Sequence, residues 1–253
     1  MAENMEHTHE EMREQYWRLL EPTFRQIQEI GLAKYFASVD LAKAFALKDR
    51  DLRCMDEGTV GGVHLAGAGI LNQSAAAEFI KEAGVEGIYS HAGCGAAALY
   101  AKQQGLELTK ADEYGIAWAK ELSERAGVPY RGHTEANEMA RPPEFHIARV
   151  AYYDGTGQFD PSPVDDLPPG FVISRRYLEP AYAKQEAEIA VAIALGEHGF
   201  GEKFTPEAPF YLVAIGDGRP GGVSADVLQK EANEIAQRHK GTVITGGFIA
   251  PLA

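Results

Sequence analysis

Cysteine is scarce in this chain: only two of its 253 residues are cysteine, Cys54 and Cys94. Basic residues are outnumbered as well, because 24 Lys and Arg stand against 37 Asp and Glu and leave a formal net charge of −13. A field of that sign repels nucleic acids and anionic membranes, so we expect neither as a partner. Long apolar runs are also missing, and no stretch is long enough to span a bilayer.

The first residues show no apolar segment behind a basic one, the pattern that marks a secretory signal. We therefore expect a cytoplasmic, reducing location, which disfavours a disulfide between the two cysteines. With 45% hydrophobic and 24% charged residues, the composition is that of an ordinary globular protein. The length allows one large domain, or a core domain with an extension.

Helical and strand-like segments alternate along the chain, which predicts an α/β protein with a parallel sheet. The expected strands are 52–55, 63–66, 85–90, 171–174, 211–215 and 243–245. The expected helices are 12–47, 75–83, 96–104, 109–127, 180–197 and 225–239, with Ser74 and Thr109 as N-caps and Gly84 as a stop signal. Residues 147–159 favour a hairpin, because Asp154-Gly155-Thr156-Gly157 supplies a tight turn between β-favouring residues.

A proline-rich passage at 160–170 is the best candidate for a domain boundary. We expect an N-terminal helical region at 1–47, a core at 48–164 and a C-terminal α/β extension at 165–253 that packs on the core. The second half contains no cysteine, and no repeat of the first half in it is convincing.

The two cysteines lie in short, chemically rich contexts. Cys54-Met55-Asp56 comes at the end of one expected strand, and His91-Ala92-Gly93-Cys94 directly follows another. Adjacent parallel strands would bring both segments to one point, since open α/β folds place ligand sites at the carboxyl ends of their strands. Two thiolates and one imidazole make a three-ligand zinc site and leave a fourth position for water or substrate.

These motifs resemble those of the β-class carbonic anhydrases. That family carries a C-x-D-x-R motif after its first strand and an H-x-x-C-G motif after a later one, in the order of Cys54-Met55-Asp56 and His91-Ala92-Gly93-Cys94-Gly95. Ala66-Gly67 matches the A-G-like turn between them, and Tyr153-Asp154-Gly155-Thr156-Gly157 is similar to a late hairpin of the family. The resemblance spans residues 40–164, about half of the chain.

The resemblance implies a fold like that of the β-carbonic anhydrases, with zinc on Cys54, His91 and Cys94 and with Asp56 as the catalytic residue. Asp56 would accept a hydrogen bond from zinc-bound hydroxide, which would hydrate carbon dioxide in the reaction of a lyase. It also implies a small-molecule substrate and a homodimer or higher homo-oligomer. The alternatives are a zinc-binding protein without turnover, and a related hydrolase that acts on carbonyl sulfide or carbon disulfide.

Two departures from the family pattern leave those alternatives open. Gly58 stands where the family has its arginine, so Asp56 is free to become a fourth metal ligand unless another arginine restrains it. Arg53, Arg131 and Arg149 are present, but the sequence does not place them. His91 follows Cys54 by 37 positions, a shorter connection than the family usually has. Two buried cysteines that act only as small hydrophobes are a further interpretation.

Overall fold

The computed structural model describes residues 2–251, and side-chain surroundings from residue 9 onward. The helices are α1 (Ala2–Ile30), α2 (Leu32–Ser38), α3 (Gln73–Ala83), α4 (Gly95–Gln103), α5 (Ala111–Ala126), α6 (Pro180–Leu195) and α7 (Ala225–Ala236). The strands are β1 (Asp51–Arg53), β2 (Val63–His64), β3 (Gly87–His91), β4 (Tyr130–Thr134), β5 (Val150–Asp154), β6 (Phe171–Ile173), β7 (Phe210–Gly216) and β8 (Val243–Ile249). No helix in this part of the chain is both long and apolar enough to cross a membrane.

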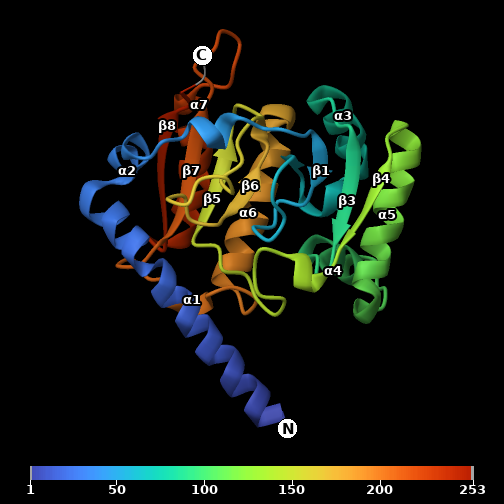
Figure 1. Ribbon diagram of the computed structural model, residues 1–253, viewed down its shortest axis with the longest axis horizontal. Helices are drawn as coiled ribbons and strands as arrows, with labels where there is room; N and C mark the ends of the chain where they lie inside the picture. The colour runs from blue at the N-terminus through green and yellow to red at the C-terminus, as the bar shows by residue number, and fades with distance from the viewer. Residues whose placement is uncertain (1, 252–253) are drawn as a thin grey trace.

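The strands form two four-stranded sheets, and every pairing within them is parallel, which confirms the α/β class. The first sheet has the order β2-β1-β3-β4, and the second has the order β6-β5-β7-β8. Both halves therefore share one topology, in which the second strand flanks the first on one side and the third and fourth follow on the other. The strands of the two sheets point in opposite directions (Figure 1).

The edges of the two sheets meet at a seam in the middle of the molecule (Figure 1). The Val172 amide of β6 donates to the Met55 carbonyl just after β1, at 3.0 Å. The Ser174 hydroxyl accepts from the His64 amide of β2, at 2.9 Å. These bonds join the second half of the chain to the loop that carries Cys54, so they help to position the candidate site.

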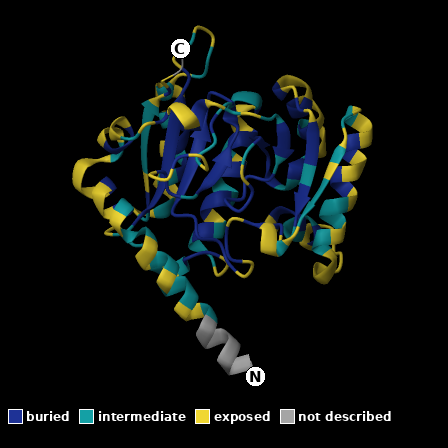
Figure 2. Ribbon diagram, viewed as in Figure 1, coloured by how far each residue is buried: buried dark blue, intermediate teal, exposed yellow. Residues whose placement is uncertain are grey.

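Helices cover both sheets, and the strands are the most deeply buried elements (Figure 2). α5 packs on β3, α6 packs on β5, β6 and β7, and α7 packs on β7 and β8. The other face of the second sheet lies under α1 and α2, where Phe36 stacks on Phe248 with ring centres 4.8 Å apart. Arg149 anchors α1: its guanidinium lies 3.6 Å from the Trp17 ring centre and pairs with Glu21 at 2.9 Å.

Several local expectations were wrong. The N-terminal helix breaks at Gly31, whose φ of 83° favours glycine, and α3 is capped by Asn72 instead of Ser74. α5 begins at Ala111 after a short 3₁₀ turn, so Thr109 is not its cap. The Gly84 stop signal is confirmed by its left-handed conformation.

The hairpin expected at residues 147–159 does not form. Residues Val150–Asp154 are instead a buried strand, β5, which pairs in parallel with both β6 and β7. β4 was not expected, because its half-exposed residues, Tyr130–Thr134, carry little apolar signal. Strand pairing passes from the first sheet to the second between β4 and β5, whereas the domain boundary at residue 164 stays a prediction.

Glu186 of α6 is a buried carboxyl group at the seam. It is 0% exposed, one of its oxygens accepts from the Ala66 amide at 2.7 Å, and the other has no hydrogen-bond partner among the described residues. Burial disfavours the charged form and, together with the nearby Cys54 thiolate, raises the pKa of Glu186 from 4.5 to about 8.

This shift predicts a pH-dependent stability. The folded protein holds the Glu186 proton more tightly than the unfolded chain does. The contribution of this proton to the free energy of unfolding is therefore complete below about pH 4.5 and is lost as pH rises toward 8. Glu186→Gln should remove up to about 1.4 kcal/mol per pH unit of that slope. Urea unfolding at pH 5.5 and 7.5 measures the slope, with Glu188→Gln on the same helix as control. Equal slopes in wild type and Glu186→Gln would contradict the assignment.

Candidate metal centre

Three side chains that are distant in sequence lie together at the carboxyl end of the first sheet. Cys54 follows β1, His91 ends β3, and Cys94 precedes α4. Their ligand atoms all lie within 4.8 Å of one another, and all three residues are buried. β1 and β3 are adjacent parallel strands, so the strand-end placement expected from the sequence is confirmed. This group can hold a metal ion, and its two sulfurs and one nitrogen suit zinc.

The His91 ring is turned for metal binding. Its Nδ1 lies 2.9 Å from the Ala92 carbonyl oxygen, which accepts a hydrogen bond and so places the proton on that nitrogen. Its Nε2 is buried without a hydrogen-bond partner among the described residues. A ligating histidine commonly donates its other N–H to a carbonyl or carboxylate in this way. The residues therefore fit a bound metal.

The backbone around the two sulfurs is equally specific. Gly67 donates its amide to Cys54 Sγ at 3.2 Å, which stabilises a thiolate. Gly67 has φ 52°, and a Cβ there would lie 3.3 Å from Cys94 Sγ and 2.9 Å from Ala96 Cβ. Glycine is thus the residue that allows this close approach. The hydrogen bond with Cys94 lowers the pKa of Cys54 well below its usual value.

Neighbouring negative charges favour the protonated form of His91 when no metal is bound. Burial alone would lower its pKa, but the Cys54 thiolate and the Asp56 carboxylate raise it to about 9. A cation therefore has to displace a proton from His91 before Nε2 can bind it.

Asp56 is held beside this group by an arginine. Arg141 Nε lies 2.7 Å from Asp56 Oδ1, and Arg141 Nη2 lies 2.9 Å from Asp56 Oδ2. Both side chains are almost completely buried. Burial alone would raise the pKa of Asp56, but the charge of His146 and the hydrogen bonds from Arg141 hold it well below its usual range. Asp56 is therefore a carboxylate with both oxygens engaged.

Gly58 makes room for Arg141. A Cβ at position 58 would lie 2.7 Å from Arg141 Cγ and 2.6 Å from the Met139 methyl group. The Gly58 amide also donates to Asp56 Oδ1 at 2.8 Å, and its carbonyl accepts from the Ala140 amide at 2.9 Å. The glycine that breaks the C-x-D-x-R pattern thus opens the space that an arginine from elsewhere in the chain fills.

The three arginines considered from the sequence lie elsewhere. Arg53 lies over the Tyr89 ring at 4.0 Å, Arg131 faces Asp51 at 3.4 Å, and Arg149 pairs with Glu21. Arg141 carries no motif of its own and is followed by two prolines, which makes it read as part of a surface loop. The sequence signal that could have indicated it is Gly58. A glycine in place of the motif arginine leaves space beside Asp56, which an arginine from another segment can occupy.

A second carboxylate, Glu57, also connects the Cys54–Asp56 loop to the segment that follows Arg141. Glu57 accepts from His146 Nδ1 at 2.9 Å and from the Ile147 amide at 2.7 Å. His146 Nδ1 also lies 3.8 Å from Asp56 Oδ2. Burial alone would lower the pKa of His146, but Glu57 and Asp56 raise it. Asp56, Glu57 and His146 thus form a second buried group of metal-ligand type, although ion pairs and hydrogen bonds already engage it.

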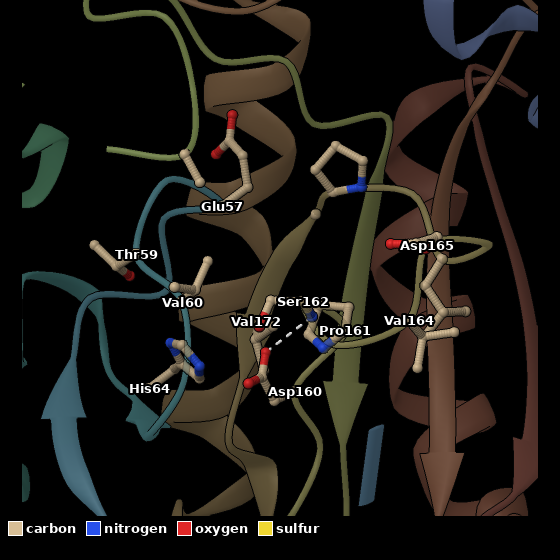
Figure 3. Close-up of a pocket in the computed structure, with 14 residues that line it drawn as sticks. Glu57, Thr59, Val60, His64, Asp160, Pro161, Ser162, Val164, Asp165 and Val172 are labelled. Carbon is tan, nitrogen blue, oxygen red and sulfur yellow. Dashed lines mark hydrogen bonds between the residues drawn. The ribbon is translucent and has the colours of Figure 1, made fainter. Parts of the chain in front are cut away.

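The loop that carries Cys54 is also supported from behind. His64 Nδ1 donates to the Cys54 carbonyl at 2.7 Å, and Thr59 Oγ1 donates to the same oxygen at 2.7 Å. Figure 3 shows Glu57, Thr59 and His64 along one side of a cavity of about 280 Å³, with Asp160 and Asp165 across from them. His64 is 1% exposed and lies in β2, at the edge of the first sheet.

A larger cavity, of about 710 Å³, reaches the front of the centre at Cys94, Arg141 and His146. Residues from α4, α6 and the segment 143–146 form most of its wall. Of the three ligand residues, Cys94 is the one that lines this cavity. His133 in β4 hydrogen-bonds Ser90 at 2.9 Å and belongs to neither ligand group.

No family model matches the chain, and no curated protein or solved structure matches it either.

The geometry predicts which variants lose metal. Cys94→Ser and His91→Ala should each reduce zinc content from about one ion per chain to less than about a tenth, because each removes one of three ligands. Atomic absorption after gel filtration measures the content, with His239→Ala as the control at a histidine outside both groups. Full zinc content in Cys94→Ser would show that the metal binds elsewhere.

The Arg141 clamp predicts a change of coordination. In Arg141→Ala, Asp56 loses its two hydrogen bonds from Arg141. Its carboxylate should then turn onto the metal and close the position that is otherwise open to water. The cobalt-substituted wild-type protein should then show a shift of its visible spectrum with azide, and Arg141→Ala should not. Adding Gly58→Arg to Arg141→Ala should restore the response, since it puts a guanidinium back in the same space. An unaltered azide response in Arg141→Ala would contradict the clamp.

Proposed function

We propose that this protein is a zinc enzyme that adds water to a small electrophile, with carbon dioxide as the first candidate. The observation that carries the proposal is the Arg141–Asp56 ion pair beside Cys54, His91 and Cys94. It supplies the arginine that the C-x-D motif lacks and keeps Asp56 from acting as a fourth ligand. The motif resemblance to β-class carbonic anhydrases supports the same chemistry.

Cys54, His91 and Cys94 would hold the zinc ion, which lowers the pKa of bound water to about 7 and so supplies a nucleophile at neutral pH. Asp56 would accept a hydrogen bond from the attacking water and orient it. Each carboxylate oxygen has two lone pairs, so Asp56 can do this while both of its oxygens remain bonded to Arg141.

His146 is placed to take the proton that the reaction releases. It lies 3.8 Å from Asp56, hydrogen-bonds Glu57, and lines the large cavity. His146 would first pass its own proton to the solvent and then take another from the Asp56 side, and Glu57 would stabilise the charged imidazole. Histidine is suited to this role because its charge changes near neutral pH.

The proposal predicts a pH profile. Hydration of carbon dioxide should rise through about pH 7, because only the deprotonated water attacks. Asp56→Asn should lower kcat by about 100-fold, the usual scale for losing a positioned acid–base group. Stopped-flow measurements with a pH indicator from pH 6 to 9 test both statements, with His239→Ala as the control.

The same measurements separate the alternatives. A protein that holds one zinc per chain, yet leaves hydration at the uncatalysed rate at every pH, binds zinc without turning over carbon dioxide. Release of sulfide from carbonyl sulfide or carbon disulfide by that protein would identify a related hydrolase.

We also propose a reducing, cytoplasmic location, which the two free cysteines support. The homodimer implied by the family resemblance stays a prediction that sedimentation of the intact protein can test.

A further inference from the structure

The cavity in front of the metal centre is far larger than carbon dioxide needs. Its volume of about 710 Å³ lies within the range of pockets that bury whole drug-sized ligands. It begins at Cys94 and runs between the start of α4 and the end of α6, where Ile193 Cδ1 lies 3.6 Å from the Cβ that Gly95 lacks. The cavity is therefore continuous with the candidate site.

The lining of this cavity is mainly apolar. Its apolar side chains come from α4, the turn before α5, the segment 143–146 and α6: Ala98, Leu99, Leu108, Phe145, Ile189 and Ile193. Leu108 is 56% exposed at the mouth of the cavity. An apolar group that enters the cavity would cover these side chains.

The charged groups of the lining are of both signs. Asp112, Glu144 and Glu197 line the cavity, together with Lys102, His146 and the Arg141 that pairs with Asp56. The net charge of −13 over the whole chain disfavours an anionic substrate. The chemistry of the lining thus fits an uncharged molecule with an apolar body.

We propose that the site hydrolyses uncharged carboxylic esters that carry an apolar acyl chain, with the chain lying between α4 and α6. This inference rests on the proposed water-activating function. In the reaction the carbonyl carbon gains the oxygen of water and its bond to the alcohol oxygen breaks. One proton of water goes to that leaving oxygen, and the other is released from the acid product to solvent.

A series of 4-nitrophenyl esters tests the proposal, because only the acyl chain changes along it. The zinc-loaded protein should hydrolyse the hexanoate with a kcat/KM at least about tenfold above that of the acetate, since each buried methylene strengthens binding about fourfold. Zinc-free Cys94→Ser provides the background rate. Equal kcat/KM values for acetate and hexanoate overturn the proposal.

A variant that fills the cavity locates the chain. Ala192 lines the cavity from an exposed position of α6, so Ala192→Trp should reduce the hexanoate kcat/KM to the acetate value and leave the zinc content unchanged. Ala181→Trp, at an exposed position of the same helix away from the cavity, should change none of these. Preference for hexanoate that survives in Ala192→Trp overturns the placement between α4 and α6.

Binding to the metal-free protein gives a readout that does not depend on turnover. 2-Octanone, an uncharged carbonyl compound that cannot be hydrolysed, should bind wild type at least about tenfold more tightly than acetone does. Ala192→Trp should abolish the difference, as followed by ligand-observed NMR. Equal binding of the two ketones overturns the proposal. A second copy of the chain that filled the cavity would give this result, because it would exclude both ketones.

The outcomes distinguish this inference from the function beneath it. Carbon dioxide hydration with a flat ester series overturns the substrate class and leaves the water-activating function standing. A zinc-loaded protein that turns over neither carbon dioxide nor any ester overturns both.

Discussion

The ion pair between Arg141 and Asp56 is the interaction on which the candidate metal centre depends. Two short hydrogen bonds bury a full charge pair next to three metal-ligand side chains. Removing one partner of such a pair typically costs about 3–5 kcal/mol, because the other charge is left buried and unpaired. The pair therefore strongly prefers one geometry. In that geometry the Asp56 oxygens point at Arg141 and not at a metal ion on the three ligands.

Hydrogen bonds from several other segments hold the loop that carries Cys54 and Asp56. His64 and Thr59 hold its carbonyl groups from behind, and Glu57 ties it to the segment at 146–148. Val172 of the second sheet bonds to Met55, and Glu186 of α6 bonds to Ala66 beside it. Both halves of the molecule thus contribute to one centre, and the opposed direction of the sheets brings the end of α6 to the carboxyl edge of the first sheet (Figure 1).

The grouping of Cys54, His91 and Cys94 was predictable from short motifs, whereas the Arg141 restraint on Asp56 was not. Cys54, His91 and Cys94 could be placed together because the ends of adjacent parallel strands meet at one edge. Arg141 could not, since its side chain reaches Asp56 from an irregular segment whose path depends on packing. The same limit applies to topology: β5 reads as half of a hairpin locally, but its all-buried residues pair with strands much further along the chain. The repeated strand order of the two halves has no counterpart in a visible sequence repeat.

The wide separation of Arg141 from Asp56 also bears on the order in which the protein folds. The three metal-ligand residues come together when β1 and β3 pair and the chain between Cys54 and Cys94 closes. The clamp requires a loop of 85 residues to close, which costs more chain entropy and brings in the segment that leads to the second half. A chain that has formed only the first sheet would therefore hold the ligands together with Asp56 still unrestrained. A metal captured at that stage could also be bound by Asp56, until the segment that carries Arg141 packs against the carboxylate.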